Sequence, residues 1–66
     1  MEAFERYKHY KGNIYELIGV ARHSETLEKM AVYRSVENGD LWVRPYDMFF
    51  ENVELDGKTT PRFEKI

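Results

Sequence analysis

Two histidines and several acidic residues are the side chains of this chain that could bind a metal or transfer protons. His23, Glu25 and Glu28 lie within six residues, and His9 could lie beside them across a sheet. Imidazole nitrogens and carboxylate oxygens can hold zinc or manganese, but this spacing matches no known ligand motif. We therefore expect a structural turn in which the two carboxylates accept backbone amides, with no metal site and no cofactor.

The chain shows no arrangement typical of an enzyme. His23 and Ser24 are neighbours, and neighbours on a strand point to opposite faces, which is a poor geometry for proton transfer between them. A nucleophile elbow and a glycine-rich phosphate loop are both missing from the sequence. We predict that the domain is not catalytic.

Polar aromatic residues and arginines form the more promising set. Trp42 and Arg44 are two positions apart, so they share a strand face. Rings and guanidinium groups together suit peptides, bases or methylated amines, although any single ring is more readily part of the core. Arg44 could also only tie down a local turn through Asp47 or Glu28. The predicted ligand-binding groove comprises eight residues: Tyr7, His9, Tyr10, His23, Glu28, Tyr33, Trp42 and Arg44.

Three hypotheses for function follow from this groove. The leading one is a non-enzymatic binding module for a peptide, a protein domain or a small nucleotide-like ligand. The second is binding of RNA or another nucleic acid through exposed rings and through Arg22, Arg34 and Arg44. The net charge of −2 argues against it. The third is a self-associating structural domain, present as a monomer or weak homodimer, whose exposed aromatic patch is the interface.

Length and composition predict one small domain over residues 1–66, with an ordered core of about 7–63. Ten aromatic residues must fill its core, because the chain has no cysteine to form disulfides. No segment approaches the roughly 18 apolar residues of a membrane helix, and the first residues lack the pattern of a secretory signal. We expect a cytoplasmic protein with no membrane partner.

The longest regular pattern is an alternation over residues 15–23, which predicts a strand. One face would carry Tyr15 and Leu17 followed by Gly19 and Ala21, and these small residues suggest a bend that leaves room for a neighbouring side chain. Further strands are expected at 7–10, 29–36, 41–44, 50–55 and 62–64.

Turn signals separate these segments at short intervals. Asn38-Gly39 predicts a type I′ hairpin, and Asp56-Gly57 predicts another turn. Pro45 ends a strand and begins a helical turn that closes at Phe49. For residues 24–33 a helix with a Ser or Thr cap is the alternative to a strand. The predicted fold is all-β: a small SH3-like barrel of about five short strands with one helical turn.

Several blocks of the sequence, in order, resemble a bacterial family known as domain of unknown function 1653. They are Tyr7-Lys8-His9-Tyr10-Lys11-Gly12, residues 19–28, Val32-Tyr33, residues 41–45, Met48-Phe49 and Pro61-Arg62-Phe63. The resemblance extends from about Tyr7 to Phe63, with Ala31 as a modest departure where relatives often have a larger aliphatic residue. It implies an SH3-type barrel and no particular activity.

Overall fold

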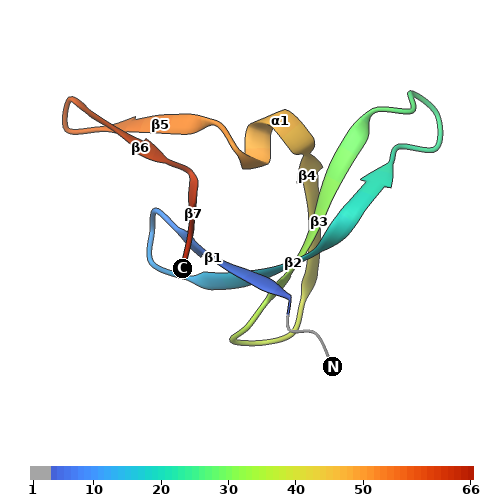
Figure 1. Ribbon diagram of the computed structural model, residues 1–66, viewed down its shortest axis with the longest axis horizontal. Coiled ribbons are helices and arrows are strands. Elements are labelled where there is room, and N and C mark those ends of the chain that lie inside the picture. The colour runs from blue at the N-terminus through green and yellow to red at the C-terminus, as the bar shows by residue number, and fades with distance from the viewer. Residues whose placement is uncertain (1–3) are drawn as a thin grey trace.

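The computed structural model describes residues 4–66, so the first three residues of the predicted domain 1–66 lie outside it. This part of the chain forms strands β1 (Glu5–His9), β2 (Ile14–Arg22), β3 (Lys29–Ser35), β4 (Leu41–Pro45), helix α1 (Tyr46–Phe49), and strands β5 (Asn52–Leu55), β6 (Lys58–Pro61) and β7 (Phe63–Lys65) (Figure 1). The prediction of an all-β fold with one helical turn is confirmed.

The strands form two antiparallel sheets. The larger has the order β4-β3-β2-β1-β7, and the smaller is the β5–β6 hairpin. The larger sheet curls, and α1 with the hairpin crosses the opening between its two ends (Figure 1). The sheet does not close into a barrel, so β4 and β7 are its edges. The prediction of about five strands is wrong, because residues 58–61 form a strand that their charge and proline obscured.

The tight two-residue hairpin lies at a different place from the one predicted. Asp56 and Gly57 have φ values of +50° and +78° and join the paired residues Leu55 and Lys58. They therefore form the type I′ turn. At the predicted site, only Gly39 of the Asn-Gly pair has a positive φ, and its N–H donates to the carbonyl of residue 35 at 2.8 Å. This connection is thus a longer loop.

A β-bulge interrupts the alternation of β2. The register with β3 shifts between Leu17 and Gly19, which makes Ile18 an extra residue. Beyond the bulge, Val20 pairs with the buried Ala31, and cross-strand partners share a face. The prediction that Gly19 and Ala21 continue the face of Tyr15 and Leu17 is therefore wrong. No neighbouring side chain occupies the space beside Gly19, because a Cβ added there would have no atom within 4 Å.

The segment before β3 is a turn and not a helix. Residues 24–26 form the turn, and β3 begins at Lys29, so the strand prediction for residues 29–35 is confirmed and the helical alternative is wrong. Pro45 precedes α1 with a φ of −50°, which its ring fixes without cost at a helix start. Within residues 4–66, no helix is long and apolar enough to cross a membrane.

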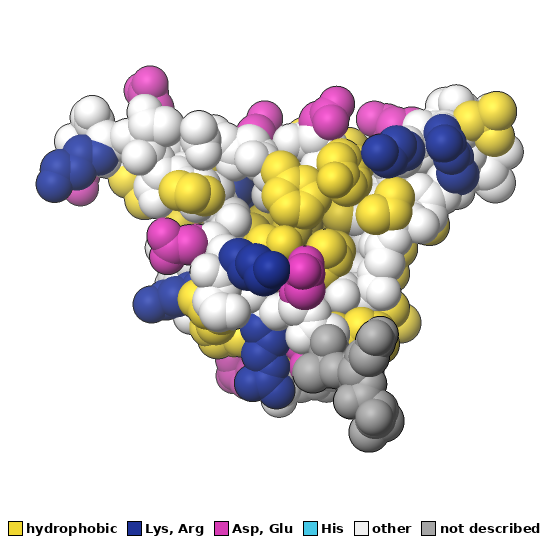
Figure 2. Space-filling model, in the orientation of Figure 1, with side chains coloured by type: hydrophobic (Ala, Val, Ile, Leu, Met, Phe, Trp, Pro, Cys, Tyr) yellow, Lys and Arg dark blue, Asp and Glu magenta, His cyan; other side chains and the backbone are white. Residues whose placement is uncertain are grey.

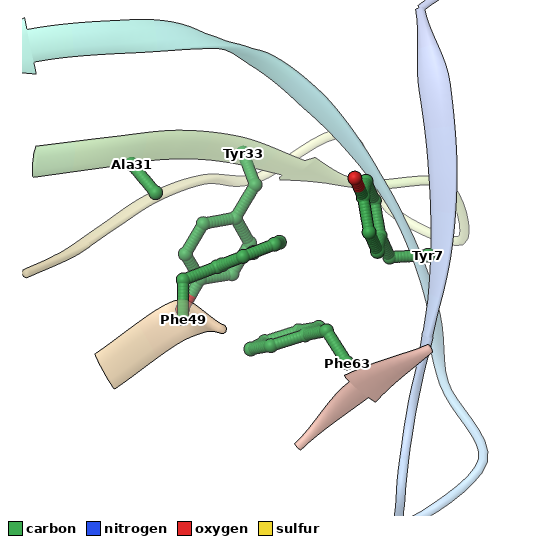
Figure 3. Packing of buried hydrophobic residues seen from close by; sticks show 5 residues of the cluster. All are labelled: Tyr7, Ala31, Tyr33, Phe49 and Phe63. Carbon is green, nitrogen blue, oxygen red and sulfur yellow. The ribbon is translucent and has the colours of Figure 1, made fainter. Parts of the chain in front are cut away.

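Five buried side chains form the core: Tyr7, Ala31, Tyr33, Phe49 and Phe63. They come from β1, β3, α1 and β7 and point toward one another inside the curled sheet (Figure 3). Phe49 is fully buried, and its ring stacks on Phe63 at 4.1 Å with an interplanar angle of 7°. The tight helical turn thus delivers the central side chain of the core.

Candidate functional site

Two residues of the predicted groove belong to the core. Tyr7 and Tyr33 are 7% and 5% exposed. The Tyr7 hydroxyl donates to Glu5 Oε1 at 3.2 Å, and burial raises the pKa of this phenol. Both rings contact Phe49. They therefore support the fold, and only the Tyr33 hydroxyl contributes to a surface feature, described below.

His23 and Glu28 lie at the outer end of the β2–β3 hairpin, away from His9. His9 ends β1, beside the start of β2, whereas His23 follows the end of β2. The nine residues of β2 correspond to roughly 30 Å of extended chain. The possibility that the two histidines lie side by side is therefore wrong, and no single groove contains both.

The hairpin end is held by His23 and not by the two glutamates. His23 Nδ1 accepts the backbone N–H groups of Glu25 and Thr26 at 3.1 and 3.4 Å. The backbone N–H of His23 donates to the carbonyl of Glu28 at 2.8 Å. The expected structural turn is present with the acceptor role reversed. Across residues 4–66, no three His, Asp or Glu side chains come close enough together to hold a metal ion.

Two separate hollows take the place of the predicted groove. The first, of about 180 Å³, lies between the end of β1 and the β5–β6 hairpin, and His9 and Tyr10 line it. The second, of about 350 Å³, lies between the β2–β3 hairpin and α1, and Glu28 lines it. Neither is lined by Trp42 or Arg44.

Arg44 lies half-buried on the inner face of β4. Its Nε donates to the Tyr33 hydroxyl at 3.4 Å, and its guanidinium carbon is 6.0 Å from the centre of the Phe63 ring. The ion pairs within residues 4–66 use other cations, so the alternative contact of Arg44 with Asp47 or Glu28 does not form. Arg44 therefore presents a positive charge beside the rings of Tyr33 and Phe63, without a carboxylate partner in the described chain.

His9 lies beside the same Phe63 ring as Arg44. Its ring is 4.9 Å from Phe63 and 4.4 Å from Tyr10, measured between ring centres. Burial lowers the pKa of His9, and the positive charges of Arg44, Lys11 and Arg62 lower it further. Nδ1 accepts the Lys11 N–H at 3.2 Å, so the proton of the neutral ring is on Nε2. His9 and Arg44 thus both offer N–H donors around Phe63.

Strand β4 is an open, apolar edge of the large sheet. Leu41, Trp42 and Val43 are 68%, 51% and 58% exposed. Ser35 N–H donates to the Asp40 carbonyl at 2.9 Å, and bonded and non-bonded pairs alternate along an antiparallel ladder. The backbone groups of Leu41 and Val43 therefore point away from β3, toward solvent.

The remaining arginines of the described chain are largely engaged. Glu16 accepts Arg34 at 2.6 Å and lies 3.5 Å from Arg6. The hydrogen bond from Arg34 is the main reason that the pKa of Glu16 is lowered. Arg62 pairs with Glu51 at 2.7 Å. These contacts leave Arg44 as the arginine best placed to meet an external acid.

A second apolar patch lies over α1. Figure 2 shows hydrophobic side chains gathered there, and neither histidine is visible on this face. Met48 and Phe50 are 40% and 41% exposed. Phe50 packs on Tyr46 at 4.9 Å and on Tyr7 at 6.0 Å between ring centres. This patch therefore continues the core outward, with its rings already packed on one another.

Sequence reasoning missed the exposed side chains beside Trp42. Leu41 and Val43 have no charged or polar character that would indicate a surface position. An apolar run of this kind is also typical of a strand buried on both faces. Only the strand order, with β4 at an edge, distinguishes the two cases.

Comparison with known proteins identifies the family but no activity. No curated protein matches the chain. A crystal structure of a protein from Bordetella bronchiseptica, described as belonging to the family DUF1653, is similar with a TM-score of 0.86 and 29% identity, over 98% of this chain and 87% of that one. The family model "Protein of unknown function (DUF1653)" matches residues 5–65. The chain therefore belongs to the DUF1653 family.

Proposed function

We propose that this chain is a non-enzymatic binding module that pairs its β4 edge with an extended segment of a partner protein and receives a carboxylate of that segment at Arg44. One observation carries the proposal: β4 is a sheet edge with three successive apolar residues more than half exposed. Beside them Arg44 has no acid partner within residues 4–66.

Backbone pairing supplies the general affinity. An added strand can bond to the outward-facing amides and carbonyls of Leu41 and Val43. Side chains then supply selectivity, because alternate residues of the added strand lie on opposite faces. Residues on one face contact Leu41 and Val43, and those on the other contact Trp42 and Arg44. The module therefore favours segments that are apolar on one face and carry an acid on the other.

Arg44 is suited to a carboxylate by its surroundings. The guanidinium is half-buried near Phe63, and charge-assisted hydrogen bonds strengthen where water is partly excluded. Its Nε contacts the Tyr33 hydroxyl, which holds the side chain in place before a ligand arrives. His9, neutral at pH 7 because its pKa is lowered, adds a donor near the same ring without adding charge.

Nucleic-acid binding ranks lower in this proposal. Arg34 is occupied by Glu16, and Arg22 donates to the Leu27 carbonyl at 3.0 Å. Phosphate contacts need several free cations on one face. Retention of RNA on filters at low salt, lost in the variant Arg44→Gln, would reverse this ranking.

The SH3-like barrel remains part of the proposal. The curled sheet, the helical turn after β4 and the hairpin across the opening support it. Two bonds also link the segments around that opening: Arg62 N–H donates to the Glu51 carbonyl and Tyr10 N–H to the Arg62 carbonyl, each at 3.0 Å. In this interpretation β4 lies on the rim, where small barrels commonly bind.

Peptide selection tests the function directly. A display library of random dodecapeptides would be selected on the immobilised chain, and the bound peptides titrated into ¹⁵N-labelled protein. We expect the selected peptides to be acidic and rich in β-branched residues, and to change chemical shifts of the protein mainly on β4. Their affinity should fall about tenfold in Arg44→Gln and stay unchanged in the control Arg6→Gln. Shift changes confined to the two hollows or to the α1 patch would refute the proposal.

A further inference from the structure

We propose that the strand paired with β4 is β4 of a second copy of this chain, in an antiparallel, two-fold arrangement with Trp42 opposite Trp42. This inference rests on the proposed function of the β4 edge and names its occupant. Such a pairing would join two five-stranded sheets into one continuous sheet across the two molecules.

The direction of the backbone groups fixes which residues can bond across the two-fold axis. Leu41 and Val43 present their amides and carbonyls outward, because Trp42 and Arg44 use theirs on β3. With Trp42 at the axis, Leu41 of each copy faces Val43 of the other. Both residues then donate and accept, and no outward-facing group between them is left without a partner.

Charge complementarity selects this register over its neighbours. With Trp42 at the axis, Arg44 of one copy lies opposite Asp40 of the other, twice by symmetry. Asp40 is exposed and forms no ion pair within residues 4–66. Opposite charges directly across an antiparallel pair are stabilising. The two charged groups that the fold leaves without partners around β4 therefore satisfy each other.

Other two-fold registers that also pair the outward backbone groups of β4 are less favourable. With Val43 at the axis, Leu41 lies opposite Pro45, which has no N–H to donate. Arg44 then meets Trp42, and Asp40 loses its basic partner. With Arg44 at the axis, two arginines of like charge face each other, which is destabilising. The sequence of β4 thus favours one self-pairing.

The two edges of the sheet differ in how they are protected. At the other edge, β7 carries Glu64 and Lys65, and Lys65 pairs with Glu5 at 3.0 Å. Charged residues on an edge discourage pairing with another chain. Within β4 the only charged side chain is Arg44, and the proposed register gives it an acid. β4 is therefore the edge left open to a second copy.

The side chains would form a continuous contact on each face. On the outer face, Leu41 and Val43 of the two copies alternate and cover one another. On the inner face the two Trp42 side chains lie at a non-bonded position, where side chains approach most closely. Cross-strand aromatic pairs are among the more favourable ones. The short strand gives a small contact area, so we expect a dimer that dissociates on dilution.

A charge exchange tests the proposal. Sedimentation equilibrium would compare the full chain with Asp40→Lys, with Arg44→Glu, and with the double variant. Each single change places like charges opposite each other twice, so dimerisation should weaken about tenfold or more. The double variant restores opposite charges and should recover affinity to within about threefold. Glu54→Lys, an exposed acid on β5 with no ion pair among the described residues, is the matched control and should leave the dimer unchanged.

Several outcomes would overturn the inference. A chain that stays monomeric at millimolar concentration would end it, as would a dimer insensitive to Asp40→Lys or a double variant that fails to recover. Circular dichroism verifies that each variant is folded. A monomeric wild type that still binds selected peptides at β4 would refute self-pairing while leaving the proposed function intact. If the chain neither dimerises nor binds selected peptides at β4, self-pairing and the proposed function are both refuted.

Discussion

Phe49 offers the sharpest test of how this small fold is held together. Its side chain is fully buried, stacks on Phe63 and meets Tyr7 and Tyr33 at 5.3 and 5.2 Å between ring centres. Truncating a buried Phe to Ala costs about 3–5 kcal/mol. A domain of 66 residues is stable by about 3–10 kcal/mol, at roughly 0.05–0.15 kcal/mol per residue. Phe49→Ala should therefore remove between a third and all of the free energy of unfolding.

Urea unfolding followed by far-UV circular dichroism measures this loss. Phe50→Ala is the control, because the two residues are adjacent and the Phe50 side chain is 41% exposed. Burial energy scales with the apolar area removed from water, so Phe50→Ala should cost about half as much or less. Equal losses, or a loss below about 1 kcal/mol for Phe49→Ala, would refute the account of the core.

Three further predictions concern a titration, a turn and a loop. The lowered pKa of His9 means that the unfolded chain binds more protons below its ordinary value near 6.5; the free energy of unfolding should fall as pH drops through 6.5 toward the lowered pKa, and His9→Gln should flatten this dependence in urea titrations. Gly57→Ala should cost about 1–2 kcal/mol, because Gly57 has a φ of +78° and an added Cβ meets nothing there, so the penalty is conformational; a neutral result in the same assay would contradict the type I′ turn. His23→Ala should speed amide exchange of Glu25 and Thr26, whose N–H groups donate to Nδ1, and unchanged rates would exclude this role for His23.

Much of the fold could be predicted from local patterns. The alternation after Ile14, the paired turn signals and Pro45 before a helical turn each express short-range sterics. The bulge at Ile18 could not be predicted, because the sequence still alternates through it and only pairing with β3 reveals the extra residue. The strand at residues 58–61 was missed because Lys58 and Pro61 are residues that strands rarely favour, and the type I′ turn before them compensates.

The eight residues of the predicted groove do not lie together, because their grouping required long-range placement. Its eight residues were chosen by chemistry, yet Tyr7 and Tyr33 are needed in the core, and the length of β2 separates His9 from His23. Arg44 and Trp42 kept their predicted relation because they are two apart on one strand. Spacing within one element was therefore predictable, whereas the neighbours of that element depended on strand order.

Hydrogen–deuterium exchange at the outward amides of β4 tests the central claim most directly. In the isolated monomer, the amides of Leu41 and Val43 should exchange rapidly, because no strand covers them. Raising the protein concentration, or adding a selected peptide, should protect these two amides while those of Trp42 and Arg44, bonded to β3, stay protected throughout. Rapid exchange of Leu41 and Val43 in a saturated complex would show that binding occurs elsewhere and that the β4 edge is not the recognition surface.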